Sequence, residues 1–377
     1  MSQFFSMEKI PGQKVDPVLL GIILLMVGVG LSLLFSASHF AAQRLLGNPL
    51  SFVLRQSMWA AIGLVGAWVV SRMTVATWRK IVPFLLLASL ILMIMTFIPL
   101  FGRELMGARR WILIGGFSFQ PSEMVKMTLI LYFANLFAKK EGQLEDLKNS
   151  LLPPFIVLSV FSFLILMQND YSTAAFVFLI GFICFFLAGV KLRYLIPALL
   201  GSSILGGLVL FSRSYRVERL MAFLDPGADP SGAGYQILSA KRALSEGGMW
   251  GVGIGAGTRK LGGIPEVQSD FIFAVLGEEM GFLGVLLMFL LFGLLLWKGV
   301  SIAMKTQDRF TFLLASGISI LISLQFLINV GVVSGVLPAT GIPLPYFSSG
   351  GSALFINLLM AGFLLGLSRK SDEGVNR

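Results

Sequence analysis

Long runs of apolar residues recur along almost the whole chain, and they limit its fold more than any other feature. A helix that crosses a hydrocarbon core of about 30 Å needs about 20 mostly apolar residues. Ten such runs stand between charged or Pro- and Gly-rich breaks. They cover approximately Val18–Ser36, Phe52–Val70, Ile81–Leu100, Pro121–Ala138, Leu152–Met167, Thr173–Gly189, Tyr194–Phe211, Phe271–Trp297, Phe310–Val336 and Ser352–Leu367. Because 56% of the residues are hydrophobic and 13% are charged, the composition also lies outside the range of soluble domains. The sequence predicts an all-α polytopic membrane protein with about ten transmembrane helices.

The basic residues orient the chain, because Lys and Arg concentrate in cytoplasmic loops. An even number of crossings puts both termini on one side of the membrane. With the termini inside, 16 of the 29 Lys and Arg residues fall in the tails and inner loops, four in the short outer loops and seven in one long outer segment. We therefore expect both termini to be cytoplasmic. The net charge of +10 is then mostly an orientation signal, and no aromatic-interleaved basic patch predicts nucleic-acid binding.

The outer segment between the seventh and eighth runs, about residues 212–269, is longer than an ordinary connection. Its apolar residues, including Tyr235, Ile237 and Trp250, predict that it lies on the bilayer or on the helix bundle. Within it, SGAGYQILSAKRALSEGG is expected to form a short amphipathic helix that begins near Ser231 and ends at Gly247 and Gly248. No internal repeat or low-complexity linker divides the chain, so residues 1–377 are expected to form one membrane domain with this large extracytoplasmic loop.

Cysteine and histidine are too scarce for several kinds of site. Cys184 and His39 are the only residues of their types, which excludes an internal disulfide, the usual zinc ligand sets and His-dependent triads within one chain. The stretch GVGIGA formally matches a dinucleotide fingerprint, but no buried strand precedes it and no βαβ pattern surrounds it. Any chemistry must therefore come from carboxylates, Lys, Arg and hydroxyl groups.

Three carboxylates stand at the start of the eighth run, in the stretch from Ile264 to Trp297. A carboxylate inside a bilayer costs about 2.5–3.5 kcal/mol on insertion scales. Asp270 lies at the outer mouth, where it is either a helix N-cap or a functional group. Glu278 and Glu279 point to different sides and are expected to bond to neighbouring helices or the flanking loop. Alternatively, the span begins near Gly281 and SDFIFAVLGEEMG is an interfacial helix.

A second polar group follows the third run. Arg109, Arg110 and Trp111 fall in an outer loop, and Glu123 and Lys126 follow at i, i+3 in the fourth run. Such a pair either neutralises itself or marks a functional site, and the spacing favours neither interpretation.

Two more polar stretches fall on the same outer side. Asp170 lies in the short turn QNDYSTA, and the tenth run is preceded by INVGVVSGVLPATGIPLPYFSSGGSALF, which is rich in Gly, Pro and hydroxyl groups. This second stretch predicts a re-entrant or kinked connection, which is acceptable at membrane depth only where it lines a cavity.

Together these motifs resemble the SEDS family (shape, elongation, division and sporulation), whose FtsW and RodA members polymerise bacterial peptidoglycan. The motifs are RRWI with QPSEMVK, QNDYSTA, FLDPGADPSGAGYQ, PEVQSDFIFAVLGEEMG and NVGVVSGVLPATGIPLPYFSSGGS. They occur in the family's order and cover nearly the whole chain. DPGADPSGAGYQ with GVGIGAGTRKLGGIPE is more similar to the FtsW and sporulation branch than to RodA.

The chain departs from the family pattern at a few positions. Asn169 replaces the Pro of QPD, Gln268 and Ser269 replace a His-Thr pair, Gly262 replaces an acidic residue and Ser349 replaces an aromatic one. The carboxylates of the pattern are retained as Glu123, Asp170, Glu266 and Asp270. The resemblance therefore implies that the activity is retained as well.

The resemblance implies that the substrate is lipid II, a disaccharide-peptide on undecaprenyl diphosphate, and that Asp270 matches the family's essential aspartate. A GlcNAc 4-hydroxyl must attack the anomeric carbon of another lipid-linked sugar. A carboxylate that takes the hydroxyl proton contributes about 10²–10⁴-fold, so Asp270 is the expected general base. The α-linked donor and β-1,4 product imply a single inversion without a covalent glycosyl-enzyme.

Cations near the departing diphosphate would stabilise the transition state. Arg110 is the first candidate because its forked donors suit phosphate oxygens. The weaker candidates are Arg109, Lys126 and Lys260, and the resemblance adds Trp111, Gln236, Ser348 and Ser349 as substrate-binding residues. Glu123, Asp170 and Glu266 are supporting carboxylates, of which Glu123 and Asp170 would orient these cations or hold a divalent ion, Mg²⁺ or Mn²⁺. No other cofactor is implied.

The resemblance also implies a class B penicillin-binding protein transpeptidase and divisome or elongation-complex proteins as partners, and a place in the bacterial cytoplasmic membrane with the active site outside. Two alternatives are a lipid II flippase and a non-catalytic division scaffold. A transporter should carry its working polar residues near the midplane, whereas here most of them lie on the outer side. In a scaffold, Asp270 would be only a helix cap.

Overall fold

All ten predicted runs form helices in the computed structural model, which describes residues 15–105, 107–114, 117–212, 214–227, 233–261, 264 and 267–371. The helices are α1 (Pro17–Leu46), α2 (Ser51–Arg72), α3 (Val75–Met95), α4 (Pro121–Lys139), α5 (Leu152–Met167), α6 (Tyr171–Leu187), α7 (Leu192–Phe211), α10 (Ile272–Lys305), α11 (Arg309–Val333) and α12 (Gly351–Ser371). Eight of the described helices are long and apolar enough to cross a membrane, and α6 is apolar but shorter. The remaining helix, α4, carries Glu123 and Lys126 in its first two turns. The predicted polytopic helical fold is confirmed.

The helices begin where the local sequence supplies a cap. Asp16 begins α1, because its Oδ1 accepts hydrogen bonds from the N–H groups of Val18 and Leu19 at 2.9 and 3.1 Å. Such caps satisfy N–H groups that have no partner within the helix. Asp308 does the same for α11 through Thr311. α1 continues beyond its predicted end to Leu46 and stops at Gly47, which has a left-handed backbone.

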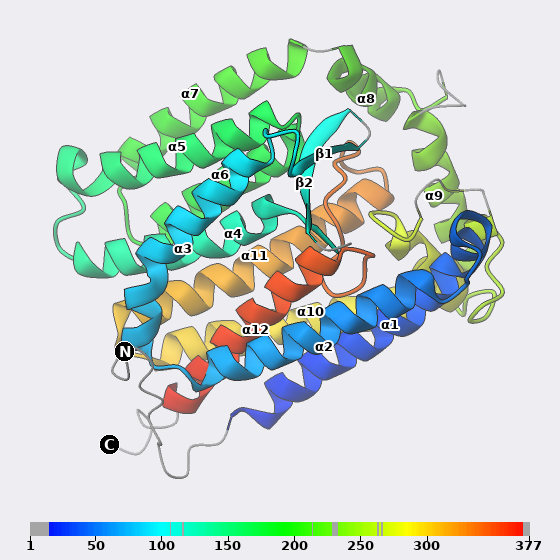
Figure 1. Ribbon diagram of the computed structural model, residues 1–377, viewed down its shortest axis with the longest axis horizontal. Coiled ribbons are helices and arrows are strands. Elements are labelled where there is room, and N and C mark those ends of the chain that lie inside the picture. The colour runs from blue at the N-terminus through cyan, green and yellow to red at the C-terminus, as the bar shows by residue number, and fades with distance from the viewer. Residues whose placement is uncertain are drawn as a thin grey trace.

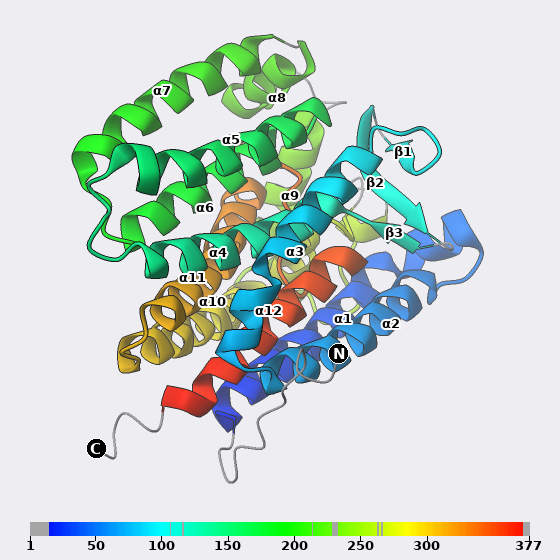
Figure 2. The same cartoon turned by 60° about the vertical axis from the view of Figure 1, so that its left-hand side comes forward.

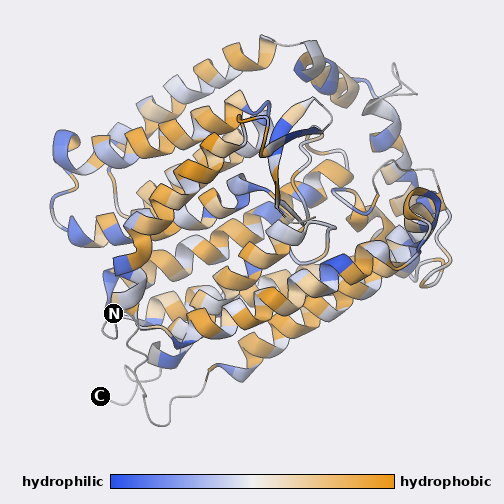
Figure 3. Cartoon of the chain, viewed as in Figure 1, coloured by the Kyte–Doolittle hydropathy of each residue, from blue (hydrophilic) through white to orange (hydrophobic). Residues whose placement is uncertain are grey.

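The helices differ strongly in how deeply they are buried. In α12 and α11, 83% and 72% of the most apolar window is buried, against 6% in α7. Figure 1 accordingly shows α11 and α12 in the middle of the bundle, and Figures 1 and 2 show α7 along its outer edge. Figure 3 shows apolar residues along the lengths of the helices and polar residues gathered near their ends. The bundle is therefore built around α11 and α12.

The beginning of α1 and the end of α12 lie at the same end of the bundle (Figure 1). The backbone N–H of Asp16 donates to Oγ of Ser368 at 3.1 Å, and Nζ of Lys298 lies 2.7 Å from Oδ2 of Asp16. An even number of crossings requires this arrangement. The polar motifs that the sequence predicts on the outer side lie at the opposite end.

That opposite end carries elements that the apolar runs do not predict. A three-stranded antiparallel sheet follows α3, with β1 (Gly102–Leu105), β2 (Ala108–Ile114) and β3 (Phe117–Phe119) in the order β1-β2-β3. Arg103 pairs with Trp111 in its register. The fold remains mostly helical, and this small sheet is an addition that the sequence did not predict.

The long outer segment folds into helices that pack on the bundle. It contains α8 (Ser214–Leu224), α9 (Ala233–Gly247) and the 3₁₀ helix η2 (Arg259–Leu261). Elsewhere in the chain, a π-helix, η1 (Leu147–Leu151), precedes α5. α9 confirms the predicted amphipathic helix. Its buried residues Ile237, Ala240 and Ala243 recur at helical spacing on the face toward α10.

Candidate functional site

Two carboxylates of α10 hold the glycine-rich outer loop onto the bundle. Oε1 of Glu278 accepts hydrogen bonds from the N–H groups of Thr258 and Arg259 at 2.7 and 3.1 Å. Glu279 pairs with the ammonium of Lys260 and accepts a hydrogen bond from Oγ of Ser36 at 2.7 Å. The expectation that these glutamates bond to the flanking loop and a neighbouring helix is confirmed.

Lys260 was predicted to lie near the diphosphate, and the structure places it in a buried ion pair with Glu279. Lys260 is 5% exposed, and its Nζ also donates to Ser36 Oγ and to the carbonyl of Gly255, both at 2.8 Å. A buried ammonium with three such partners is fully satisfied within the protein. Lys260 therefore anchors the loop, and its predicted role toward a ligand stays a prediction.

The glycines of this loop allow it to lie against a break in α10. Gly281 has φ 62° and ψ −157°, which divides α10 into a buried segment before it and a long apolar helix after it. A Cβ at Gly281 would lie 2.4 Å from the backbone nitrogen of Gly251. The break lies where the alternative interpretation starts the span, and the segment before it is buried in the protein.

A second ion pair ties the same loop to α9. Nε of Arg259 donates to Oε2 of Glu246 at 3.0 Å. The hydrogen bond from Arg259 holds the pKa of the Glu246 carboxyl below its usual value. The stretch from Thr258 to Lys260 is therefore fixed to both α9 and α10.

Arg110 and Asp170 come together between the sheet and α6. Asp170 begins α6, because its Oδ1 accepts from the N–H of Thr173 at 3.2 Å, and its Oδ2 lies 3.5 Å from Nε of Arg110. Nη2 of Arg110 also donates to the carbonyl of Asn169 at 2.9 Å. Asn169 has a positive φ of 61°, a backbone that Asn adopts more readily than most residues. The departure from Pro to Asn at this position is thus compatible with the turn.

A cavity of about 290 Å³ opens beside this pair. Its polar lining includes Arg110 and Asp170 together with two arginines of α8, Arg216 and Arg219. The guanidinium of Arg216 is mostly used within the protein, since its Nη1 donates to the carbonyl of Val209 at 2.6 Å. Arg219 is exposed. A basic cavity of this kind suits an anionic group such as a phosphate.

Asp270 lies beside Gly341, whose neighbours in the chain line this cavity. α10 begins at Ile272 with Phe271 at its N-cap, so Asp270 is in the preceding turn and is not the N-cap that one interpretation expected. Asp270 is half-buried, and a Cβ at Gly341 would lie 3.8 Å from its Oδ2. The neighbouring residues Thr340 and Ile342 line the cavity. One short stretch of backbone thus stands between Asp270 and the arginine-lined cavity.

An amide of α11 fixes these two stretches together. Nδ2 of Asn329 donates to the carbonyl of Asp270 at 2.8 Å and to the carbonyl of Ile342 at 2.9 Å. Asn329 is 1% exposed, so these bonds are protected from water. They hold Asp270 in a defined place relative to the connection before α12.

The Glu123–Lys126 pair supports the same connection from α4. Nζ of Lys126 lies 2.8 Å from Oε2 of Glu123 and donates to Oε1 of Gln325 at 3.1 Å, and Nε2 of Gln325 donates to the carbonyl of Pro343 at 2.9 Å. Both charged side chains are at most 4% exposed. The two charges therefore neutralise each other, which is one of the two interpretations that the spacing of Glu123 and Lys126 left open.

The connection from 334 to 350 is held on the bundle by its own polar groups. Ser348 is 4% exposed, its Oγ accepts from the N–H of Leu344 at 2.8 Å, and its carbonyl accepts from Nε2 of Gln56 at 2.9 Å. Ser348 therefore closes a turn and is not presented to a ligand. The backbone N–H of Ser349 donates to the carbonyl of Gln268 at 2.8 Å, which joins this turn to the stretch before Asp270.

The other predicted site residues are more dispersed. Arg109 is exposed and pairs with Glu104 at 3.2 Å. Trp111 lies on β2 and Gln236 on α9, and both are partly exposed. Glu266 and Gly262 lie outside the described residues.

The described residues do not suit a metal ion. No group of three His, Cys, Asp or Glu side chains within the described ranges could hold one. Glu123 and Asp170, the predicted ligands, each face a cation of the protein instead. Cys184 is buried, and burial fits an inert thiol.

Arg216 and Arg219 are the site residues that sequence reasoning missed. They belong to α8, whose charged and apolar residues alternate at helical spacing directly after the seventh run. That amphipathic pattern was a usable signal, because a helix beside a membrane surface directs its cations to one face.

Comparison with known proteins agrees with the sequence motifs. The family model FTSW_RODA_SPOVE, described as cell cycle protein, matches residues 17–373. A protein of Geobacter sp. (strain M18) named probable peptidoglycan glycosyltransferase FtsW is 37% identical over 366 residues, which are 97% of this chain and 99% of that protein. Stage V sporulation protein E of Bacillus subtilis (strain 168) is also 37% identical, over 95% of this chain and 99% of its own length.

Solved structures share the fold. A chain solved in work described as "Structural coordination of polymerization and crosslinking by a peptidoglycan synthase complex" superposes with a TM-score of 0.78 at 28% identity and covers 95% of this chain and 98% of its own. The rod shape determining protein RodA of Thermus thermophilus superposes with a TM-score of 0.66 at 25% identity, covering 94% of this chain and 97% of its own.

Proposed function

Because the chain belongs to the FtsW/RodA/SpoVE family, we propose that it is a peptidoglycan glycosyltransferase that polymerises lipid II. Its relatives of nearly full length carry that activity in their names. The observation that supports a site for it is the position of Asp270 beside Gly341, because the residues on either side of Gly341 line a cavity together with Arg110 and Arg219.

The proposed reaction is an inverting glycosyl transfer. The GlcNAc 4-hydroxyl of one lipid-linked chain attacks the anomeric carbon of another, the carboxylate of Asp270 takes the hydroxyl proton, and the bond to the lipid diphosphate breaks with its electron pair. A carboxylate in that role contributes about 10²–10⁴-fold. The product is a glycan longer by one disaccharide and a free lipid diphosphate.

The cations beside the cavity are suited to the leaving group. Arg110 and Arg219 would bind the departing diphosphate, because guanidinium groups make paired hydrogen bonds to phosphate oxygens. Asp170 keeps Arg110 in place through its 3.5 Å contact. Lys126 and Lys260 are less suited to this role because each is buried against its own glutamate.

The proposed setting is the bacterial cytoplasmic membrane, with both termini inside and the site outside. The distribution of Lys and Arg supports this orientation. A similar chain occurs in a synthase complex that coordinates polymerization and crosslinking, which supports a class B penicillin-binding protein transpeptidase as the partner. The proposed biological role is cell division or cell-shape maintenance.

One assay tests this function against transport and scaffolding. Purified protein is incubated with fluorescent lipid II in detergent, with and without a partner transpeptidase, so that no membrane has to be crossed. The wild type should form glycan polymer. Asp270→Asn should lose about 100-fold or more of the rate, whereas Asp146→Asn, an exposed aspartate beside η1, should keep it.

Two different outcomes would contradict two different parts of the proposal. Polymer formed by Asp270→Asn at the wild-type rate would remove Asp270 as the base while leaving the enzyme. No polymer from the wild type even with the partner would favour a flippase or a scaffold.

A further inference from the structure

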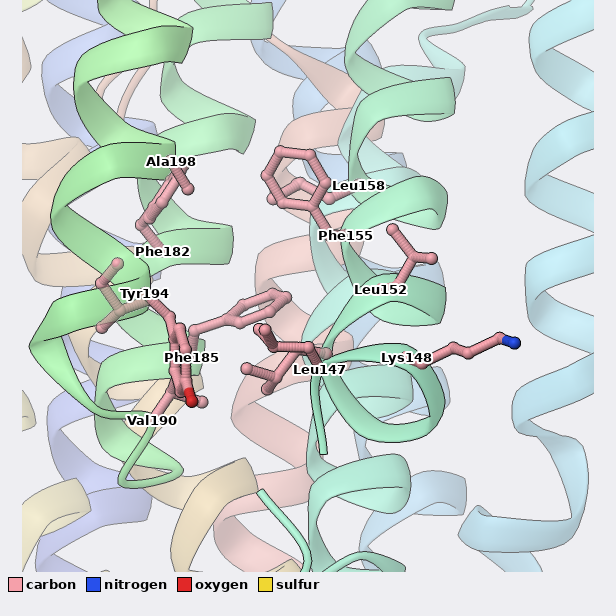
Figure 4. Close-up of a pocket in the computed structure, with 12 residues that line it drawn as sticks. Leu147, Lys148, Leu152, Phe155, Leu158, Phe182, Phe185, Val190, Tyr194 and Ala198 are labelled. Carbon is pink, nitrogen blue, oxygen red and sulfur yellow. The ribbon is translucent and has the colours of Figure 1, made fainter. Parts of the chain in front are cut away.

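A large apolar cavity lies between α5, α6 and α7, at the end of the bundle where α1 begins. Its volume is about 390 Å³, well above the engineered apolar cavity of about 150 Å³ that binds benzene. Figure 4 shows the rings of Phe155, Phe182 and Phe185 and the side chain of Ala198 around it. The cavity is open on one side, so a molecule from the surroundings of the bundle can enter it.

The position of α7 shows what kind of occupant is available. Leu195 is its only buried residue among those described, so α7 touches the bundle weakly and faces the bilayer along most of its length. The cavity separates α7 from α5. In a membrane, the molecules beside such an apolar opening are lipids, and their acyl chains match its lining.

Polar groups occur only at one end of the cavity. Figure 4 shows the hydroxyl of Tyr194 at the end near Val190, and the ammonium of Lys148 directed away from the ring cluster. Nη2 of Arg193 donates to the Tyr194 hydroxyl at 2.7 Å. A lipid whose tail lay among the aromatic rings would therefore place its headgroup beside Lys148 and Arg193.

The charges at this rim favour an anionic headgroup. Lys191 pairs with Glu145, which also lies near Arg193. The carboxylate of Asp146 accepts bonds from the N–H groups of Lys148 and Asn149. Within the described ranges, neither Lys148 nor Arg193 forms an ion pair with a carboxylate, and basic pockets between membrane helices bind anionic lipid headgroups.

We propose that this cavity binds an anionic phospholipid of the phosphatidylglycerol class, with one acyl chain between α5, α6 and α7 and its phosphate beside Lys148 and Arg193. This binding site lies at the opposite end of the bundle from Asp270 and does not depend on the proposed polymerase activity. The lipid would fill the space that now separates α7 from α5.

Native mass spectrometry of the purified full-length protein tests the proposal, with added phosphatidylglycerol or phosphatidylcholine as the probe. The wild type should retain phosphatidylglycerol at least five-fold better than phosphatidylcholine. Lys148→Gln should reduce that preference at least three-fold, whereas Lys305→Gln, an exposed lysine at the end of α10, should not.

Filling the cavity is the second arm of the test. Ala198→Phe should reduce retention of both lipids at least ten-fold, and the smaller change Ala198→Leu should reduce it in part, so that a folding defect of the first variant does not decide the result. Ile204→Phe, on the exposed face of α7, is the matched control and should bind as the wild type does. Equal retention of the two lipids by the wild type, or unchanged retention in both folded Ala198 variants, would overturn the proposal.

Discussion

Glu279 and Lys260 form an ion pair whose side chains are 1% and 3% exposed. The two residues are 19 positions apart, on α10 and on the 3₁₀ helix of the outer loop. Ser36 of α1 bonds to both of them. This pair therefore joins α1, α10 and the glycine-rich loop at one buried point.

Removing one partner of this pair should destabilise the protein strongly. Lys260→Met leaves the Glu279 carboxylate buried without its cation, and breaking a buried ion pair in this way costs about 3–5 kcal/mol. The double variant Lys260→Met, Glu279→Gln should recover most of that loss because no charge remains. Thermal unfolding in detergent measures both, with Lys305→Met as the exposed control. Equal unfolding midpoints for Lys260→Met and the wild type would show that the ion pair does not stabilise the fold.

Gly281 should be one of the least replaceable glycines of α10. Gly281→Ala places a Cβ in a left-handed backbone and 2.4 Å from the nitrogen of Gly251, and the strain and overpacking together should cost about 2–5 kcal/mol. Gly293→Ala is the matched control in the same helix, since nothing lies within 4 Å of its added Cβ. It should be neutral or stabilise by up to about 1 kcal/mol. Denaturation curves for the two variants should therefore separate, and coincident curves would contradict the close approach of the loop.

The helices could be predicted because a bilayer imposes a length on each apolar run. α9 could be predicted because its apolar residues recur at helical spacing. The sheet could not, since its short strands carry Arg103, Arg109 and Arg110 among glycines and show no clean alternation. The hydrophobic pattern does not signal a three-residue strand such as β3.

The candidate site was predictable in its residue types and less so in its pairings. Asp270 and Asp170 stood out as carboxylates of the family pattern, and Arg110 stood out because its forked donors suit phosphate oxygens. Which glutamate neutralises Lys260 depends on a contact between α10 and the loop that the local sequence does not encode. For the same reason Lys260 and Ser348 were expected at the ligand, whereas the fold uses both internally.

Arg219 of α8 should contribute more to substrate binding than the exposed Arg242 of α9 does. It is the exposed arginine of α8 that lines the cavity beside Asp170, and a diphosphate bound there would lose a charge-assisted contact in Arg219→Gln. Such contacts contribute about 1.5–3 kcal/mol, so kcat/KM for lipid II should fall about 10–100-fold. Arg242→Gln, an exposed change on α9, is the control. Equal kcat/KM values for the two variants would place the diphosphate elsewhere.

Replacing Gly341 should lower the activity of Asp270, because Gly341 determines the backbone conformation of the connection between α11 and α12. Its φ of 69° is a conformation that costs other L-residues about 1–2 kcal/mol. The added Cβ itself would make only an ordinary contact with the Asp270 carboxylate, at 3.8 Å, so the backbone strain is what would move the connection. Gly341→Ala should therefore displace the wall between Asp270 and the cavity, and a shift of about 1 Å can reduce a rate about 100-fold. Lipid II polymerisation should fall by at least ten-fold, while the unfolding midpoint changes by only a few degrees. Gly350→Ala, whose added Cβ meets only the Cβ of Ala353 at an ordinary 3.4 Å, controls for a methyl group in the same connection. If both variants polymerised lipid II at the wild-type rate, the connection would have no part in positioning the base.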